Sequence, residues 1–172
     1  MTWVVPETAP ADEPFLGGER QMLHGFLQYA RESLLLRCAG LTAEQLVIRA
    51  SPPSGLSLLG IIRHVTDVER TWFRIRFAGQ DVAPRYQTPE NPDGAFDDTR
   101  PEQADDDIAR YRAEWAAVDT ALGGLTLDAT YDSPRWGVMS LRWVYLHMIR
   151  EYSAHGGQAD LIRERIDGRT YS

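Results

Sequence analysis

Imidazole and carboxylate side chains recur at every fourth position in the stretch HMIREYSAHGGQADLIRE, residues 147–164. The three residues are His147, Glu151 and His155. Histidine nitrogens and glutamate oxygens are ligands of zinc and other divalent metals, at donor distances of about 2 Å. Because residues four apart lie on one face of a helix, the spacing predicts that a helix here contributes a pair of metal ligands.

The rise of an α-helix prevents all three of these residues from binding one ion. Residues eight positions apart are separated by about 12 Å along the axis, so His147 and His155 should not bind the same ion. The pair is therefore either His147 with Glu151 or Glu151 with His155, and the spacing leaves both open. In either case a third ligand must come from another helix.

A candidate for the third ligand lies in the stretch LLGIIRHVTDVERTWF, residues 58–73. His64 follows Ile61 and precedes Val68 on an apolar helical face, so it should border the core. Asp67 comes one turn later and is a candidate hydrogen-bond partner that fixes the tautomer of the His64 imidazole.

The same residues also allow a reading without a metal. Glu151 stands in the middle of a heptad seam that runs from Leu141 to Ile162 and is apolar at both ends. An ionised glutamate buried on such a seam needs a partner, because its desolvation is costly. The partner is a metal ion in one interpretation and Arg63 or Arg150 in the other. Histidines beside an apolar face are also common as ordinary packing residues.

Apolar periodicity predicts four long helices that would position these residues, over about residues 19–39, 58–78, 101–122 and 141–166. Thr42 and Gln45 predict a capping box on a short helical turn. No segment alternates with period two, so no strand is expected. The predicted fold is an all-α, four-helix bundle over residues 15–172, with long irregular connections and an extended arm at residues 1–14. The polar connection at residues 80–99 is long enough to be functional or mobile.

Composition excludes several classes of function. The 172-residue chain has a net charge of −7, which argues against a nucleic-acid partner. It holds no lysine, which excludes Schiff-base chemistry, and no long apolar run that would span a membrane. The single cysteine, Cys38, precludes an internal disulfide and favours a reducing cytoplasm. Cys38 lies on an apolar stripe and is expected in the core rather than as a nucleophile.

The histidine stretch at residues 58–73, together with the later EYSAHGGQ, resembles the DinB-like superfamily of metal-binding four-helix bundles over about residues 15–168. The resemblance is strongest to its actinobacterial branch, which includes proteins labelled mini-circle protein. The superfamily's metal triad has one histidine on the second helix and two residues four apart on the last helix. The matching positions here are His64, Glu151 and His155, and His147 falls outside the triad.

Two departures from the superfamily pattern bear on the site. Many relatives have a third histidine where this chain has Glu151, but the related mycothiol-dependent maleylpyruvate isomerase is also His/Glu/His. Gly156 stands where an arginine usually precedes Gly-Gln. Tandem Gly156 and Gly157 would each cost a helix about 1 kcal/mol relative to alanine. A close approach by the neighbouring helix would explain why these glycines are tolerated.

The resemblance implies a divalent metal, with zinc first and nickel or iron as alternatives. It also implies a low-molecular-weight thiol of the mycothiol type as co-substrate, a small electrophile as its partner, and a homodimer. The expected activity is a thiol S-transferase or a thiol-assisted isomerase. Two alternatives are a zinc hydrolase that uses the same triad and a non-catalytic, stress-responsive metal-binding protein.

Further residues are candidates for the surroundings of the metal. The sequence places Asp67, His147, Gln158 and Trp72 near the triad. Trp72, Trp136 and the connection at residues 80–99 would shape a pocket, unless the tryptophans serve only for packing. Arg63 and Arg135 are candidates for holding a carboxylate of the substrate.

Overall fold

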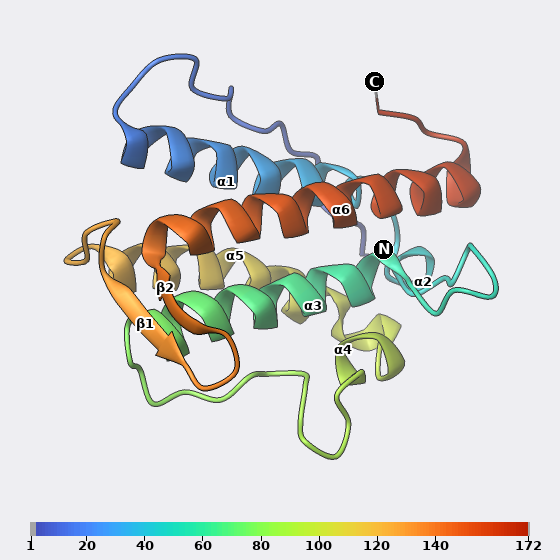
Figure 1. The fold of residues 1–172 in the computed structure, drawn as a ribbon. Coiled ribbons are helices and arrows are strands. Elements are labelled where there is room, and N and C mark those ends of the chain that lie inside the picture. Colours follow the sequence, from blue (N-terminus) through green and yellow to red (C-terminus); the bar gives the residue numbers. More distant parts are fainter. Residues whose placement is uncertain (1–2, 172) are drawn as a thin grey trace.

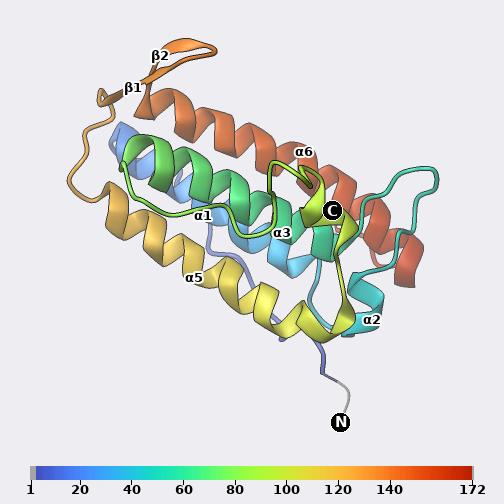
Figure 2. The same ribbon diagram turned by 90° about the horizontal axis from the view of Figure 1, so that it is seen from below.

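The computed structural model describes residues 3–171, which form a mostly helical fold with one small two-stranded sheet (Figure 1). Helix α1 packs along α6, and α3 packs against both α5 and α6 (Figures 1 and 2). The long helical segments are α1 (Glu19–Leu36), α3 (Leu58–Glu69) with its π-helical continuation η1 (Arg70–Phe77), α5 (Ala104–Leu122) and α6 (Leu141–Asp167). The prediction of a mainly helical protein is confirmed.

The ends of α6 follow from local sequence. The Ser140 hydroxyl accepts a hydrogen bond from the backbone N–H of Trp143 and so caps the first turn. Gly168 ends the helix in the left-handed region with a φ of 79°, a conformation that favours glycine. The helix therefore begins and ends close to the predicted limits.

Three short helical segments connect the long ones: α2 (Ala43–Leu46), α4 (Gly94–Asp97) and η2 (Pro101–Gln103). The predicted capping box on α2 is confirmed, because Thr42 and Gln45 exchange side-chain and backbone hydrogen bonds. Helix α4 lies inside the connection at residues 80–99, which the sequence had predicted to be irregular throughout.

A β-hairpin precedes α6, and its absence from the prediction is an error. Strand β1 (Thr130–Ser133) pairs antiparallel with β2 (Gly137–Ser140), which runs directly into α6. Each strand has four residues and mostly exposed or half-buried side chains, so neither shows a detectable alternation of apolar and polar residues in the sequence. The hairpin lies over the η1 end of the helices (Figure 1).

The core between the long helices holds both apolar side chains and one buried ionic cluster. The Arg31 guanidinium of α1 donates to both carboxylate oxygens of Glu69 of α3, and the Tyr152 hydroxyl of α6 donates to the same carboxylate. Cys38 is fully buried nearby, and burial raises the pKa of its thiol to about 12. The expectation that Cys38 is a core residue is confirmed.

The N-terminal segment lies against the end of α1. The backbone N–H of Val5 donates to the carbonyl of Leu41, and the N–H of Gly40 donates to the carbonyl of Val5, both at 2.9 Å. The Val5 side chain is buried. Within residues 3–171, no helix combines the length and the apolar character needed to cross a membrane.

Candidate metal centre

The side chains of His64, Glu151 and His155 converge where α3 packs along α6. Each offers one ligand atom, and these atoms all lie within 4.8 Å of one another. The His155 Nε2 atom is 3.8 Å from a Glu151 carboxylate oxygen, and the rings of His64 and His155 meet edge to face with centroids 4.8 Å apart. Of the two pairs that spacing left open, the structure brings Glu151 and His155 together with His64.

The cluster lies at the edge of the core rather than inside it. The Glu151 side chain is 29% exposed and that of His155 is 14% exposed. The prediction that Glu151 stands on a buried seam is wrong. The buried face of α6 passes through Tyr145, Tyr152 and Ala159 instead. Glu151 lies one position from this row, so Glu151 and His155 remain partly exposed.

Electrostatics favour the metal-binding form of His64. Burial first, and the nearby His155 second, lower the pKa of the His64 imidazole to about 4, although Glu151 opposes the shift. At neutral pH the ring is therefore uncharged and has a free lone pair, as a metal ligand requires. Two imidazoles and one carboxylate are a donor set that suits zinc with open coordination positions.

Side-chain amides contact one nitrogen of each imidazole. The Nδ1 atom of His155 lies 2.8 Å from the Gln158 amide oxygen, which leaves its Nε2 atom facing Glu151. Such a contact orients a metal-binding imidazole. The Nδ1 atom of His64 lies 3.4 Å from the Gln87 side-chain nitrogen. Gln158 was among the sequence candidates, whereas Gln87 was missed because nothing in a polar loop marks one amide.

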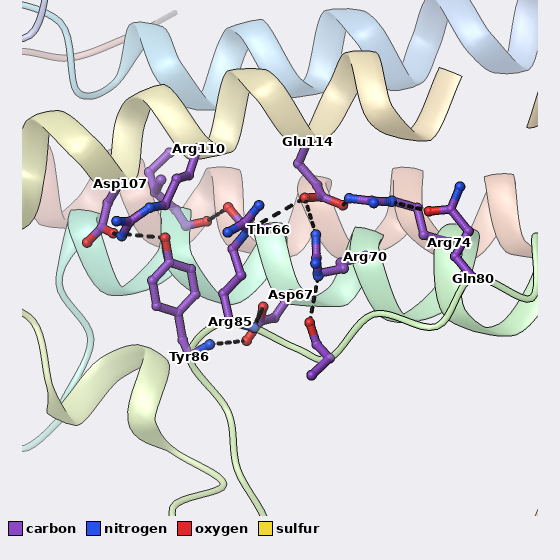
Figure 3. Close-up of polar contacts among 12 residues, drawn as sticks. Thr66, Asp67, Arg70, Arg74, Gln80, Arg85, Tyr86, Asp107, Arg110 and Glu114 are labelled. Atoms are coloured by element: carbon purple, nitrogen blue, oxygen red, sulfur yellow. Dashed lines mark hydrogen bonds and ion pairs between the residues drawn. The ribbon is translucent and has the colours of Figure 1, made fainter. Parts of the chain in front are cut away.

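Asp67 is not the hydrogen-bond partner of the His64 imidazole that the sequence predicted. Its buried carboxylate accepts hydrogen bonds from the backbone N–H groups of Arg85, Tyr86 and Gln87, at 2.6, 2.8 and 3.0 Å (Figure 3). It therefore contacts the loop and not the His64 imidazole. Its effect on His64 is therefore indirect, through the placement of Gln87.

The same loop is held at further points (Figure 3). The Arg70 guanidinium donates to the Ala83 carbonyl at 2.6 Å and to the Glu114 carboxylate at 2.9 Å. The Tyr86 hydroxyl donates to Asp107 of α5 at 2.8 Å. These contacts fasten residues 83–87 to α3, η1 and α5. The connection that the sequence predicted to be functional or mobile is thus fixed beside the candidate ligands.

His147 lies on the flank of the triad. Its ring stacks on Trp143 at a centroid distance of 5.0 Å and meets the edge of Trp72 at the same distance. Its Nε2 atom is 4.0 Å from Glu151, and Arg150 contacts its Nδ1 atom at 3.1 Å. Burial lowers the pKa of the His147 imidazole. The residue forms part of an aromatic wall next to the ligands.

Within residues 3–171, none of the arginines considered from sequence lies within ion-pair distance of Glu151. Arg63 is buried and donates to the backbone carbonyls of Gly94 and Asp98. Among residues 3–171, the only side chains within ion-pair distance of Glu151 are those of His147 and His155. The alternative in which Arg63 or Arg150 compensates Glu151 is therefore wrong. Arg135 lies outside, over the Trp136 ring.

Two adjoining hollows open beside the triad. The smaller, of about 290 Å³, is lined by His64, Glu151, Gln87, Arg76 and others. The larger, of about 630 Å³, is walled mainly by Trp72, Trp136 and Trp143 together with β2. Trp72, Trp136 and His147 border both hollows. Two of the candidate ligands, His64 and Glu151, therefore face a space with an apolar, aromatic extension.

The explanation offered for Gly156 and Gly157 is wrong. A Cβ atom at either position would meet no neighbouring atom within 4 Å. They instead border an open groove between α1 and α6. The structure shows no packing reason for glycine at these two positions.

Comparisons with known proteins agree with this geometry. The model of the family described as mycothiol-S-transferase matches residues 22–168, a range that contains all three candidate ligands. Comparison with curated proteins and with solved structures gave no match. Because the family match spans most of the sequence, the chain belongs to the mycothiol-S-transferase family.

Proposed function

We propose that this protein is a metal-dependent S-transferase that joins a low-molecular-weight thiol of the mycothiol type to a small electrophile. His64, Glu151 and His155 would hold the metal, with zinc preferred and nickel or iron also compatible with this ligand set. The observation that carries the proposal is the convergence of these three donors within 4.8 Å, in a chain that matches the mycothiol-S-transferase family.

A divalent metal with open positions lowers the pKa of a bound thiol and so supplies a thiolate at neutral pH. The chain's own residues do the remaining work. Gln158 accepts a hydrogen bond from Nδ1 of His155 and leaves the Nε2 atom of that ring free for the metal, and the fastened loop keeps Gln87 beside His64. The aromatic wall of Trp72 and His147 limits the access of water to one side of the triad.

The transfer step balances without a further reagent. The thiol proton passes to solvent, and the sulfur donates an electron pair to an electrophilic carbon to form a carbon–sulfur bond. A leaving group then departs with the electron pair of the bond that breaks. The adjoining aromatic cavity supports this reaction over hydrolysis, because an apolar wall suits an organic electrophile better than an attacking water.

The proposal also extends to the fold and the setting of the protein. We infer that the four long helices form a DinB-like four-helix bundle, and that the protein works as a homodimer in the cytoplasm. The single buried cysteine fits a reducing compartment. Light scattering of the purified protein tests the dimer, which a monomeric mass would contradict.

Metal content is the first test. Metal-depleted wild-type protein, reconstituted with zinc and dialysed, should retain about one ion per chain by elemental analysis, as expected for one three-ligand site. The variants Glu151→Ala and His155→Ala should lose it. Glu164→Ala is the matched control, because Glu164 is an exposed carboxylate on the same helix. Sub-stoichiometric zinc in the reconstituted wild type would overturn the metal site.

Thiol transfer is the second test. Monochlorobimane should form a fluorescent conjugate with mycothiol in the presence of the zinc-loaded wild type and the Glu164→Ala control. The two ligand variants should lose this activity. Rates that are unchanged in Glu151→Ala and His155→Ala would remove the triad from the reaction.

A further inference from the structure

One arginine in the hollow next to the triad has no anionic partner. Among residues 3–171, no carboxylate lies within ion-pair distance of Arg76, and its side chain makes no hydrogen bond. Two arginines of the same helical segment differ, since Arg70 and Arg74 both bind Glu114, at 2.9 and 2.8 Å. Arg76 is therefore a half-buried positive charge that the fold leaves uncompensated.

Aromatic rings hold this guanidinium in place. Its central carbon lies 4.0 Å from the centroid of Trp72 and 5.6 Å from that of Trp136. A guanidinium that stacks on an aromatic face keeps its N–H donors directed outward at its edge, where they match the two oxygens of a carboxylate. Burial lowers the pKa of Arg76, yet the group stays charged at neutral pH.

The adjoining cavity is suited to a flat apolar group. The rings of Trp72 and Trp136 stack with centroids 6.0 Å apart, and Trp143 lies 5.6 Å from Trp72. Trp136 is 53% exposed, which is unusual for so large an apolar side chain. Since Arg76 lines the hollow that also contains His64 and Glu151, an anchored ring would lie beside the triad.

We propose that the electrophile is an aromatic compound bearing a carboxylate, whose ring enters the cavity of Trp72, Trp136 and Trp143 and whose carboxylate binds Arg76. This inference rests on the proposed transferase function. In the reaction with a chlorinated ring, the thiolate sulfur donates an electron pair to the ring carbon and forms the carbon–sulfur bond. The carbon–chlorine bond breaks, and chloride leaves with its electron pair.

Binding is tested on metal-free protein with unreactive probes. The probes are dinitrobenzoate and its neutral methyl ester, and quenching of tryptophan fluorescence reports their Kd values. Arg76→Gln should weaken binding of the benzoate about tenfold, as expected for loss of a charge-assisted contact, and change that of the ester less than about twofold. The control Arg165→Gln removes an exposed charge at the far end of α6 and should change neither.

Two results would overturn the assignment of Arg76. One is an unchanged Kd for the benzoate in Arg76→Gln, and the other is an equal loss of affinity for the benzoate and the ester. A second variant tests the ring site. Trp136→Ala should weaken both probes, and the exposure of Trp136 means that the fold should tolerate the change, which circular dichroism checks. Wild-type binding of both probes by Trp136→Ala would exclude the cavity.

Turnover separates this inference from the proposed function. With zinc and mycothiol, a chlorodinitrobenzoate should react with a lower KM than its methyl ester, and Arg76→Gln should abolish that preference. Carboxylate-dependent binding without any thiol transfer would overturn the transferase and keep the Arg76 site. Transfer to monochlorobimane without a preference for the carboxylate probe would overturn the Arg76 site and keep the transferase.

Discussion

Two glutamates of this protein illustrate two different uses of a carboxylate. Glu69 is 1% exposed, and its oxygens accept hydrogen bonds from Arg31 and Tyr152. Glu151 is 29% exposed, and the imidazoles of His64, His147 and His155 lie beside its carboxylate. A fully buried charge persists only with complete pairing. Glu151 keeps partial hydration, so the fold tolerates it without a cation and leaves its oxygens available.

The arginines of η1 repeat the contrast. Arg70 and Arg74 share Glu114 and fasten the loop beside the triad, and their charges are thereby satisfied. Arg76 stacks on the aromatic rings of Trp72 and Trp136, and no carboxylate of residues 3–171 lies within ion-pair distance of it. In both comparisons, of the glutamates and of the arginines, the side chain that lacks an oppositely charged internal partner lies on the face that carries the candidate metal ligands. Incomplete pairing therefore distinguishes the candidate site from structural clusters that contain the same residue types.

The largest effect on stability should come from removing Glu69 from the buried cluster of Arg31, Glu69 and Tyr152. Glu69→Ala leaves the buried Arg31 with the partly exposed Asp119 carboxylate, at 3.6 Å, in place of its closer partner, and the free energy of unfolding should fall by about 3–5 kcal/mol. Glu151→Ala in the metal-free protein should change it by less than about 1 kcal/mol, because a half-exposed charge contributes little. Urea denaturation measures both. Equal losses in the two variants would contradict the distinction between them.

Zinc should stabilise the fold by binding to His64, Glu151 and His155. At free zinc about 100 times above its Kd, mass action should add about 2.7 kcal/mol to the free energy of unfolding of the wild type. Glu151→Ala should gain far less, because it lacks one ligand. Thermal melts with and without zinc measure the difference. An equal rise in Tm for both proteins would indicate that zinc binds elsewhere.

The free energy of unfolding of the metal-free protein should depend on pH because of the lowered pKa of His64. Its pKa is lowered from 6.5 to about 4 in the fold, so between these values the unfolded chain binds a proton that the folded chain does not. The free energy of unfolding should therefore decrease as the pH falls through this window, by about 1–3 kcal/mol in total. His64→Gln should lack this component. An identical pH profile for the two proteins, measured by urea denaturation, would contradict the lowered pKa.

The smallest effect concerns the glycines that follow His155. Gly156→Ala should raise the free energy of unfolding by up to about 1 kcal/mol, because alanine favours the helix and the added Cβ enters open space. Zinc content should stay at the wild-type level. Differential scanning calorimetry and elemental analysis check the two results. A loss of stability would contradict the open space around Gly156.

The sequence alone was sufficient for the long helices and for the spacing that identifies the candidate ligands. Apolar periodicity and capping residues act within a few turns of helix, so the limits of α6 and the box at Thr42 and Gln45 could be predicted. Helical rise also separated His147 from His155. The resemblance to the DinB-like superfamily selected His64, Glu151 and His155, and these are the side chains that converge.

Tertiary structure decided the rest, because burial and pairing depend on segments that are distant in sequence. The packing of α1 and α3 against α6 placed Glu151 at the edge of the core and not on a buried seam. The loop contacts turned Asp67 from a partner of His64 into an anchor of residues 85–87. That Arg76 lacks a counter-charge can be recognised only when η1, the hairpin and α6 are packed together. In the sequence, nothing distinguishes this arginine, four residues after Trp72, from an arginine that forms an ion pair.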